Sequence, residues 1–273
     1  MRIATWNVNS IKQRIDSART WLAERQPDIV CLQETKCVDD AFPRMEFESL
    51  GYNVAVHGQK TFNGVALLSK LPFDEVNNGL PGDDQDDHAR FIEAVVSTAK
   101  GALRVASIYL PNGNPPDTEK YTYKIGWMKR LAAYARGRLS LEEPLIMAGD
   151  YNVIPTAADA KNPQAWTGDA LFLPKTRDEF RSLINLGLTD ALRATSDDPG
   201  LYTFWDYQAG AWQKNNGIRI DHLLLSPLAV DRLSGAGIDR HVRTWEKPSD
   251  HVPVWIDLDI EAKSSAAANP AGA

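Results

Sequence analysis

The 273-residue sequence contains only two cysteines, Cys31 and Cys37. Two thiols cannot form the dense disulfide framework of a small secreted domain, and no set of cysteines and histidines has the spacing of a zinc site. Cys31 lies within the apolar run IVCLQ, which is typical of a small core residue. The composition therefore excludes a scaffold held together by disulfides or structural zinc.

Long hydrophobic runs are also missing. The first residues, MRIATWNVNS, contain no apolar run long enough for a signal peptide. No later stretch approaches the roughly 18–20 apolar residues that a membrane-spanning helix needs. We therefore expect a soluble, cytoplasmic protein that makes no membrane contact.

The sequence has no surplus of positive charge. Its 30 lysines and arginines are outnumbered by 36 aspartates and glutamates, for a formal net charge of −6. This total argues mildly against a nucleic-acid ligand. It does not exclude one, because affinity for phosphates depends on where lysines and arginines lie, and a carboxylate metal site makes the total more negative.

The residues that are present form an ordinary globular mixture, with 43% hydrophobic and 24% charged residues. Apolar runs and alternation predict strands, and apolar residues at helical spacing predict helices. Strands are expected at residues 2–8, 28–33, 52–57, 64–68, 91–98, 103–110, 144–148, 202–207, 219–225 and 252–260, and helices after Ser10 and at 43–50, 118–139 and 178–185. This pattern predicts an α/β fold, a sandwich of two sheets packed face to face with helices outside. Residues 261–273 have the composition of a disordered tail.

The most informative pattern is that six of the predicted strands border acidic or amide residues. Rigid strand ends beside loops are where catalytic groups collect. If these ends share one edge of the sandwich, several carboxylates meet there, and a divalent cation would relieve their repulsion. Oxygen ligands favour Mg²⁺ or Mn²⁺ over zinc. The residues concerned are Asn7, Glu34, Asp150, Asn152, Asp221, Asp250 and His251.

Each part of this pattern also has a simpler explanation. Asn7 taken alone is typical of a turn, the Gly149–Asn152 segment of a tight turn after a core strand, and Asp250 of a helix cap. Glu34 and Asp221 are harder to dismiss, because a carboxylate within an apolar strand needs a partner. The six strand ends considered together favour a metal-assisted site.

At these residues the chain resembles the exonuclease III family of AP endonucleases, within the endonuclease/exonuclease/phosphatase superfamily. GDYN and SDH alone would mark only the superfamily, whereas LQETK, HGQK and EKPSDHVPVW are closer to exonuclease III. The resemblance covers about residues 1–260, which we expect to form the catalytic domain. The matching segments are WNVNS at 6–10, LQETK at 32–36, HGQK at 57–60, YLPNG at 109–113, GDYN at 149–152, RIDHLLLS at 219–226 and EKPSDHVPVW at 246–255.

The sequence departs from the family pattern at a few positions without losing a functional group. Ser10 stands where glycine is frequent, and Tyr151 replaces the usual phenylalanine or methionine. Asn112 occupies a position where relatives have glutamine or asparagine, so an amide that can contact phosphate is retained.

The resemblance implies a four-layered α/β sandwich and a Mg²⁺-dependent DNA repair nuclease, with Mn²⁺ as a possible substitute. The implied activities are hydrolysis of the backbone 5′ to an abasic site, 3′→5′ exonuclease and 3′-phosphatase activity on double-stranded DNA, by a monomer. One alternative is a related phosphohydrolase acting on inositol phosphates or lipids, although the missing signal peptide weakens the lipid option. A DNA-binding scaffold without catalysis is a second alternative, which the competent side chains at all the catalytic positions of the family pattern disfavour.

The resemblance also implies roles for the metal-binding side chains. Glu34 would coordinate Mg²⁺, with Asn7 and Asp250 beside it as ligands or as their supports. Asp150 would either deprotonate the attacking water or hold a second ion, and Asn152 would contact a phosphate oxygen and orient Asp150.

Three further side chains are expected to act on the phosphate. His251 would bind it, with Asp221 accepting the other ring N–H and favouring the imidazolium; the alternatives are that His251 is the base or a metal ligand. Tyr109 would hydrogen-bond the phosphate or assist the leaving group, unless it only packs on the sheet.

DNA contacts are expected from a separate group of cationic, amide and aromatic residues. For the aromatic members, a pocket for a flipped abasic sugar competes with core packing as an explanation. The group comprises Lys60, Arg90, Asn112, Phe204, Trp205 and Arg219.

Overall fold

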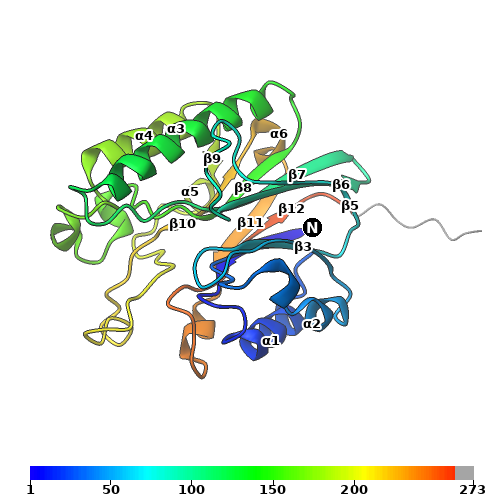
Figure 1. Cartoon of the computed structure of the whole chain (residues 1–273), viewed down its shortest axis with the longest axis horizontal. Coiled ribbons are helices and arrows are strands. Elements are labelled where there is room, and N and C mark those ends of the chain that lie inside the picture. The colour runs from blue at the N-terminus through cyan, green and yellow to red at the C-terminus, as the bar shows by residue number, and fades with distance from the viewer. Residues whose placement is uncertain (262–273) are drawn as a thin grey trace, which may run out of the picture.

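The computed structural model describes residues 1–261, and its centre is a pair of six-stranded sheets (Figure 1). The first sheet has the strand order β11-β12-β1-β2-β4-β3. Strands β1 and β2 run parallel, and the other neighbours are antiparallel. The strands are β1 (Arg2–Asn7), β2 (Ile29–Gln33), β3 (Asn53–His57), β4 (Val65–Ser69), β11 (Leu233–Ile238) and β12 (Val254–Leu258).

The second sheet has the strand order β5-β6-β7-β8-β10-β9. Strands β7 and β8 run parallel, and the remaining pairs are antiparallel, so both sheets are mixed. The strands are β5 (Phe73–Asn78), β6 (Phe91–Thr98), β7 (Gly101–Tyr109), β8 (Leu145–Asp150), β9 (Thr189–Asp190) and β10 (Asp221–Leu225).

Helices cover the outer face of each sheet. In Figure 1, α3 and α4 lie on one side of the sheet pair and α1 and α2 on the other. One apolar cluster lies between the sheets, and two more lie between a sheet and its helices, which gives the predicted four-layered sandwich. None of the helices in residues 1–261 is long and apolar enough to cross a bilayer. The helices are α1 (Ile15–Arg25), α2 (Arg44–Glu48), α3 (Glu119–Leu139), α4 (Pro174–Ile184), α5 (Ala191–Thr195) and α6 (Pro227–Val230), with 3₁₀ turns at Asp39–Ala41, Ala157–Asp159, Pro163–Trp166 and Arg240–Thr244.

The core follows from the alternation of side chains along each strand. Residues such as Ile29 and Cys31 of β2 face the second sheet, while Val30 and Leu32 face α1 and α2. A strand buried on both faces reads as a continuous apolar run, as IVCL does here. Cys31 is fully buried, and burial raises the pKa of its thiol, in agreement with the core role expected from the sequence.

Several predicted elements differ from the structure. Residues 202–207 form an irregular loop in which Phe204 makes isolated bridges to Ile218 and His251, so the predicted strand there is wrong. The predicted strand at 219–225 begins only at Asp221, and β5 and β11 were not predicted. Those two are largely exposed or glycine-containing edge strands that lack clear alternation. Residues 262–273, most of the expected tail, lie outside the described residues.

Candidate active site

The polar strand ends meet at one edge of the sandwich because of how the strands pair. Parallel β1 and β2 end together, and parallel β7 and β8 place Tyr109 opposite Asp150. Antiparallel β10 starts where β8 ends, so that Asp221 also pairs with Asp150. His251 precedes β12, which runs antiparallel to β1, and therefore lies at the same edge. The topology thus brings together residues from six separate segments.

The centre of this edge is a cluster of Glu34, Asp150 and His251. One ligand atom from each of these residues lies within 4.8 Å of those of the other two. The buried amide of Asn7 donates from Nδ2 to Glu34 Oε1 at 2.8 Å and to Asp150 Oδ2 at 2.9 Å. A single amide therefore holds carboxylates from the two different sheets side by side.

The chemistry of this cluster fits a hard divalent cation. Burial raises the pKa of Asp150 to about 7, an effect that His251 opposes and Asp221 reinforces. Binding of a cation between Asp150 and Glu34 would offset that cost, and carboxylate and amide oxygens are ligands suited to Mg²⁺ or Mn²⁺. His251 Nε2 faces the same space, 3.6 Å from Asp150 Oδ2.

His251 is held as part of a buried ion pair. Its Nδ1 lies 2.9 Å from Oδ2 of the fully buried Asp221. Burial alone would lower the pKa of His251, but Asp221 and then Asp150 outweigh it and raise the pKa to about 10. The two carboxylates therefore favour the imidazolium form, whose Nε2–H would be directed into the cluster.

Two asparagines support Asp150 from the neighbouring loops. The backbone N–H of Asn152 donates to Asp150 Oδ1 at 2.9 Å, and its side chain donates to the carbonyl of Leu110 at 2.9 Å. Asn112 Nδ2 donates to Asn152 Oδ1 at 3.2 Å. Asn152 adopts a φ of +48°, a left-handed conformation that asparagine tolerates better than most residues. The left-handed backbone of Asn152 thus directs its N–H at the Asp150 carboxylate.

Tyr109 lies at the rim of the cluster with Arg90 over its ring. The Arg90 guanidinium carbon is 4.9 Å from the centre of the Tyr109 ring. Burial raises the pKa of the Tyr109 hydroxyl, as do Glu34 and Asp150, so that the hydroxyl remains a proton donor at neutral pH.

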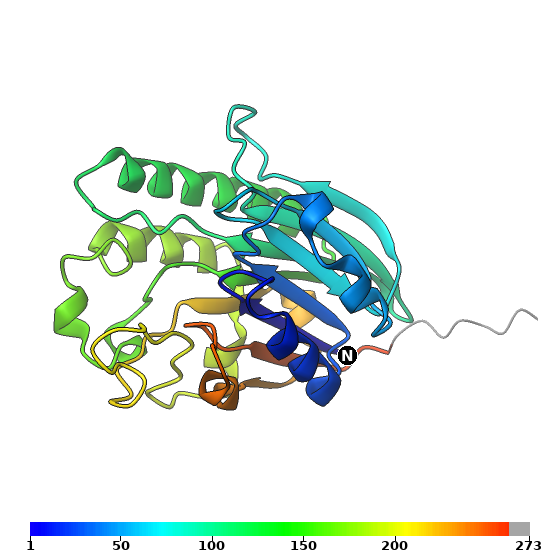
Figure 2. The same cartoon turned by 60° about the horizontal axis from the view of Figure 1, so that its bottom comes forward.

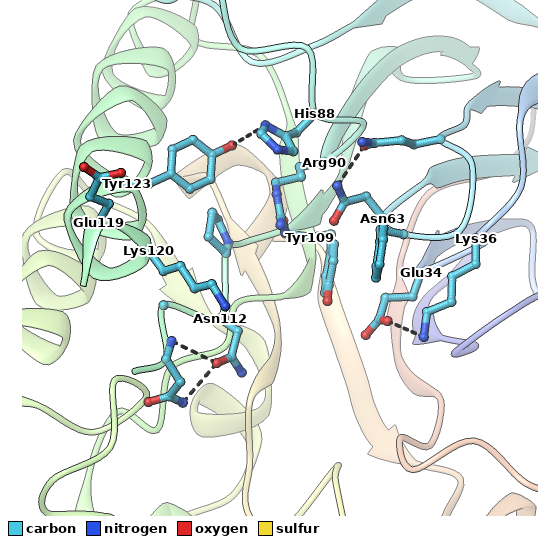
Figure 3. A pocket seen from close by; sticks show the side chains of 15 residues that line it. Glu34, Lys36, Asn63, His88, Arg90, Tyr109, Asn112, Glu119, Lys120 and Tyr123 are labelled. Atoms are coloured by element: carbon cyan, nitrogen blue, oxygen red, sulfur yellow. Dashed lines mark hydrogen bonds and ion pairs between the residues drawn. The ribbon is translucent and has the colours of Figure 1, made fainter. Parts of the chain in front are cut away.

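A cavity of about 690 Å³ adjoins this cluster (Figure 3). Glu34 and Tyr109 line the end of the cavity next to the cluster, and the cavity extends from there towards the start of α3. Despite the net charge of −6, the cavity lining has an excess of positive charge, which suits an anionic ligand, because its carboxylates Glu34 and Glu119 are outnumbered by three cationic side chains. They are Lys36, Arg90 and Lys120.

The remaining residues expected to contact DNA lie in different environments. Arg90 and Asn112 line the cavity. Lys60 is exposed and lies in the same loop as Gln59 and Phe62, which also line the cavity. Phe204 is half-buried, with its ring edge-on to that of His251 at a centroid distance of 5.0 Å. The loops carrying these two rings lie side by side in Figure 2.

Arg219 and Trp205 do not lie where a DNA contact requires. Arg219 is 1% exposed, and its guanidinium donates to Asp159 Oδ1 at 2.7 Å and to Asp190 Oδ2 at 2.6 Å. Trp205 is fully buried and packs edge-on against Trp212 at 4.8 Å. The charge of Arg219 is thus neutralised within the protein, and Trp205 packs in the core as the alternative explanation predicted, so neither residue is among the DNA contacts proposed below.

The Arg219 ion pairs lead to a stability prediction. Asp159 is fully buried and also accepts from Arg193 Nη2 at 2.7 Å. We expect Asp159→Ala to lower the free energy of unfolding by about 3–5 kcal/mol, since it removes the carboxylate shared by Arg219 and Arg193 and leaves the buried Arg219 guanidinium with Asp190 alone. Asp178→Ala, which removes an exposed pair with Arg181, is the matched control and should cost under about 1 kcal/mol. Urea unfolding of both variants measures the difference, and equal losses would contradict the assignment.

The pH dependence of that contribution follows from the direction of the pKa shift. Burial would raise the pKa of Asp159, but Arg219 and the hydrogen bonds it receives lower it well below the ordinary value of 3.8. The stabilisation is therefore fully present above the unfolded-state pKa and is lost only as the pH falls towards the lower folded-state pKa.

Two residues near the cluster were not singled out from the sequence, although both lie in the quoted motifs. Lys36 Nζ lies 2.9 Å from Glu34 Oε2 and donates to Asn9 Oδ1 at 2.5 Å. Asn9 in turn donates to Asp250 Oδ1 at 3.0 Å. Two residues, Asn9 and Lys36, thus separate Asp250 from Glu34, and Asp250 lies outside the group formed by Glu34, Asp150 and His251.

Comparison with known proteins agrees with this geometry. Residues 4–251 match the Endonuclease/Exonuclease/phosphatase family. The chain is 34% identical to exodeoxyribonuclease III of Haemophilus influenzae, with 94% of this chain and 100% of that protein covered. It is 31% identical to the DNA repair nuclease APEX1 of Danio rerio, with 95% and 83% covered.

Two solved structures are similar over almost the whole chain. A 3′ phosphatase from Neisseria bound to a product DNA hairpin superposes with a TM-score of 0.91 at 37% identity, covering 95% of this chain and 99% of that one. An AP endonuclease from Archaeoglobus fulgidus superposes with a TM-score of 0.89 at 35% identity, again covering 95% and 99%. The chain is therefore an enzyme of the endonuclease/exonuclease/phosphatase family, in the exonuclease III branch that its motifs predict.

Proposed function

We propose that this protein is a Mg²⁺-dependent DNA repair nuclease that hydrolyses the phosphodiester 5′ to an abasic site and also removes nucleotides or phosphate from 3′ ends. One observation carries the proposal: Asn7 joins Glu34 and Asp150 beside the His251–Asp221 pair, and this cluster adjoins a cavity lined by cations. The relatives named for exodeoxyribonuclease and AP endonuclease activity support this choice of substrate.

The metal would be held by the Glu34 and Asp150 carboxylates, with Asn7 positioning both. Mg²⁺, or Mn²⁺ in its place, would neutralise charge that develops on the phosphate oxygens. Asp250 supports this arrangement from further out, through Asn9 and Lys36.

The chain's own groups account for the remaining steps. Asp150, fixed by the Asn152 N–H, orients the attacking water and accepts its proton. The His251 imidazolium donates Nε2–H to a phosphate oxygen, with Asp221 holding the ring. The Tyr109 hydroxyl stays protonated at neutral pH and donates a hydrogen bond to the phosphate or to the leaving 3′-oxygen.

The DNA backbone would lie along the cavity, where Arg90 and Asn112 can contact phosphates. Phe204, edge-on to His251, would border the space for a sugar that carries no base. Since one chain supplies all of these groups, we expect the monomer to be active.

A labelled duplex tests this proposal directly. We expect a 5′-labelled DNA duplex with one central abasic analogue to be cut with Mg²⁺ and to remain intact with EDTA, because two carboxylates without a cation would repel the phosphate. One discrete product on a gel indicates endonuclease activity, and a ladder from the 3′ end indicates exonuclease activity. An inositol phosphate and a phosphoinositide, offered under the same conditions, are the controls. Preferential turnover of either, or cleavage that persists in EDTA, would contradict the proposal.

A further inference from the structure

The structure contains a buried lysine beneath the site that none of the steps above uses. Lys124 lies in the second turn of α3 and is 0% exposed. Burial lowers the pKa of its amine to about 7, an effect that Asp150 and Asp169 oppose from a distance. Burial of a polar group costs stability unless hydrogen bonds compensate it, and the Lys124 nitrogen makes two of them.

Lys124 hydrogen-bonds the backbone of two loops that follow neighbouring parallel strands. Its Nζ donates to the carbonyl of Asn112, after β7, at 3.0 Å and to the carbonyl of Asn152, after β8, at 2.6 Å. The side chains of the same two asparagines are joined by the hydrogen bond from Asn112 Nδ2 to Asn152 Oδ1. One side-chain nitrogen therefore fixes the relative position of both loops.

The local backbone is shaped around this lysine. Gly113 has a φ of +86°, and a Cβ atom there would lie 2.6 Å from Lys124 Cδ. Asn152 holds its left-handed φ of +48° while its carbonyl accepts from Lys124 and its N–H donates to Asp150. Asparagine tolerates this conformation, and the two hydrogen bonds hold the Asn152 backbone in it.

We propose that Lys124 is a positioning residue for catalysis, which clamps the Asn112 and Asn152 loops and thereby aims Asn152 at Asp150. This role depends on the nuclease function proposed above. Without the clamp, the Asn152 N–H is free to move away from Asp150 Oδ1, and the Asn112 amide loses its fixed position at the cavity. Shifts of about 1 Å in such groups can reduce turnover by about 100-fold.

The first test compares Lys124→Met with Lys129→Met, an exposed lysine on the same helix. Met fills the space of the lysine stem but has no donor. We expect kcat on the abasic duplex to fall about 100-fold while KM and the Kd for DNA in EDTA change less than about 3-fold. Lys129→Met should match the wild type. Lys124→Gln keeps an N–H₂ donor on a shorter stem, and we expect it to recover part of the lost kcat. Wild-type kcat in a folded Lys124→Met variant, or no recovery in Lys124→Gln, would overturn the proposal.

The second test does not depend on nuclease activity. Amide hydrogen exchange should accelerate in Lys124→Met at residues 110–113 and 150–153 and stay unchanged in the strands of both sheets. Unchanged exchange in these loops, or a uniform increase across the protein, would refute the clamp. If Lys124→Met does not fold, the same comparison is made with Lys124→Gln. Wild-type protein that fails to cut DNA would count against the proposed function alone, because the exchange result still decides whether Lys124 holds the loops.

Discussion

Replacement of Asp150 by alanine is expected to reduce cleavage of an abasic duplex by about 10³- to 10⁴-fold, because Asp150 is assigned both the attacking water and a share of the metal. Binding of the same duplex in EDTA should be largely spared. Asp150 is buried, and the cationic residues that line the neighbouring cavity do not depend on it. Single-turnover cleavage and fluorescence anisotropy measure the two quantities separately.

The loss of activity should not come from unfolding. Burial raises the pKa of Asp150 to about 7, from an ordinary value of 3.8, so its ionised form destabilises the metal-free fold as the pH rises through that range. Asp150→Asn keeps an oxygen that can accept from Asn152 and removes the charge, so we expect it to be at least as stable as the wild type at neutral pH. Asp197→Ala, at an exposed carboxylate, is the matched control for both measurements. Near-normal cleavage by Asp150→Ala would rule out the role given to Asp150.

The layers of the fold could be predicted because they depend on local patterns. Continuous apolar runs such as IVCL and PLIMA became central strands, and the helical pattern at residues 118–139 became α3. The strands β5 and β11 lie at sheet edges, where a strand needs no continuous apolar face. Their sequences FDEVNN and LSGAGI therefore carry no clear strand signal.

The centre of the site was predictable for a related reason. Glu34 directly follows the apolar strand β2, and Asp150 is the last residue of the apolar strand β8. A carboxylate at the end of an apolar run can be recognised in the sequence alone. That the two would share one amide donor, Asn7, could not be predicted, because the contact between the sheets is a tertiary property.

The buried environments of Arg219 and Lys124 were not predicted from the sequence. Arg219 is adjacent to a strand of the site, but its partners Asp159 and Asp190 are 60 and 29 positions away, and only the fold shows that they bury it. Lys124 shares the buried face of α3 with Trp127, Met128 and Leu131. A lysine at a core position of a helical pattern is a signal that could have marked it as unusual.

The second large effect is expected at Asp221, the partner of His251. Asp221→Asn preserves the shape of the side chain but removes the charge that does most to raise the pKa of His251 to about 10. Burial then lowers the pKa of the ring, and at neutral pH a larger share of His251 is neutral. We expect kcat/KM at neutral pH to fall by on the order of 10²-fold or more, as when a buried histidine loses its orienting carboxylate elsewhere. Asp257→Asn, at a carboxylate paired with Arg2 near the other end of β1, is the matched control.

The pH profile separates loss of the imidazolium from simple disruption of the site. In the wild type, the ion pair contributes stability fully below the unfolded-state pKa of about 6.5, and this contribution is lost only as the pH rises through about 10. In Asp221→Asn the ring deprotonates at lower pH, so residual activity should rise as the assay is moved from about pH 8 towards pH 6, a trend absent from the wild type. Titration of the His251 ring by NMR in the metal-free proteins measures the shift without relying on turnover. If both proteins titrate alike, Asp221 does not hold the charge on His251, and the role given to Asp221 would have to be abandoned, because burial lowers the pKa of the ring and only the remaining carboxylate Asp150 could then oppose it.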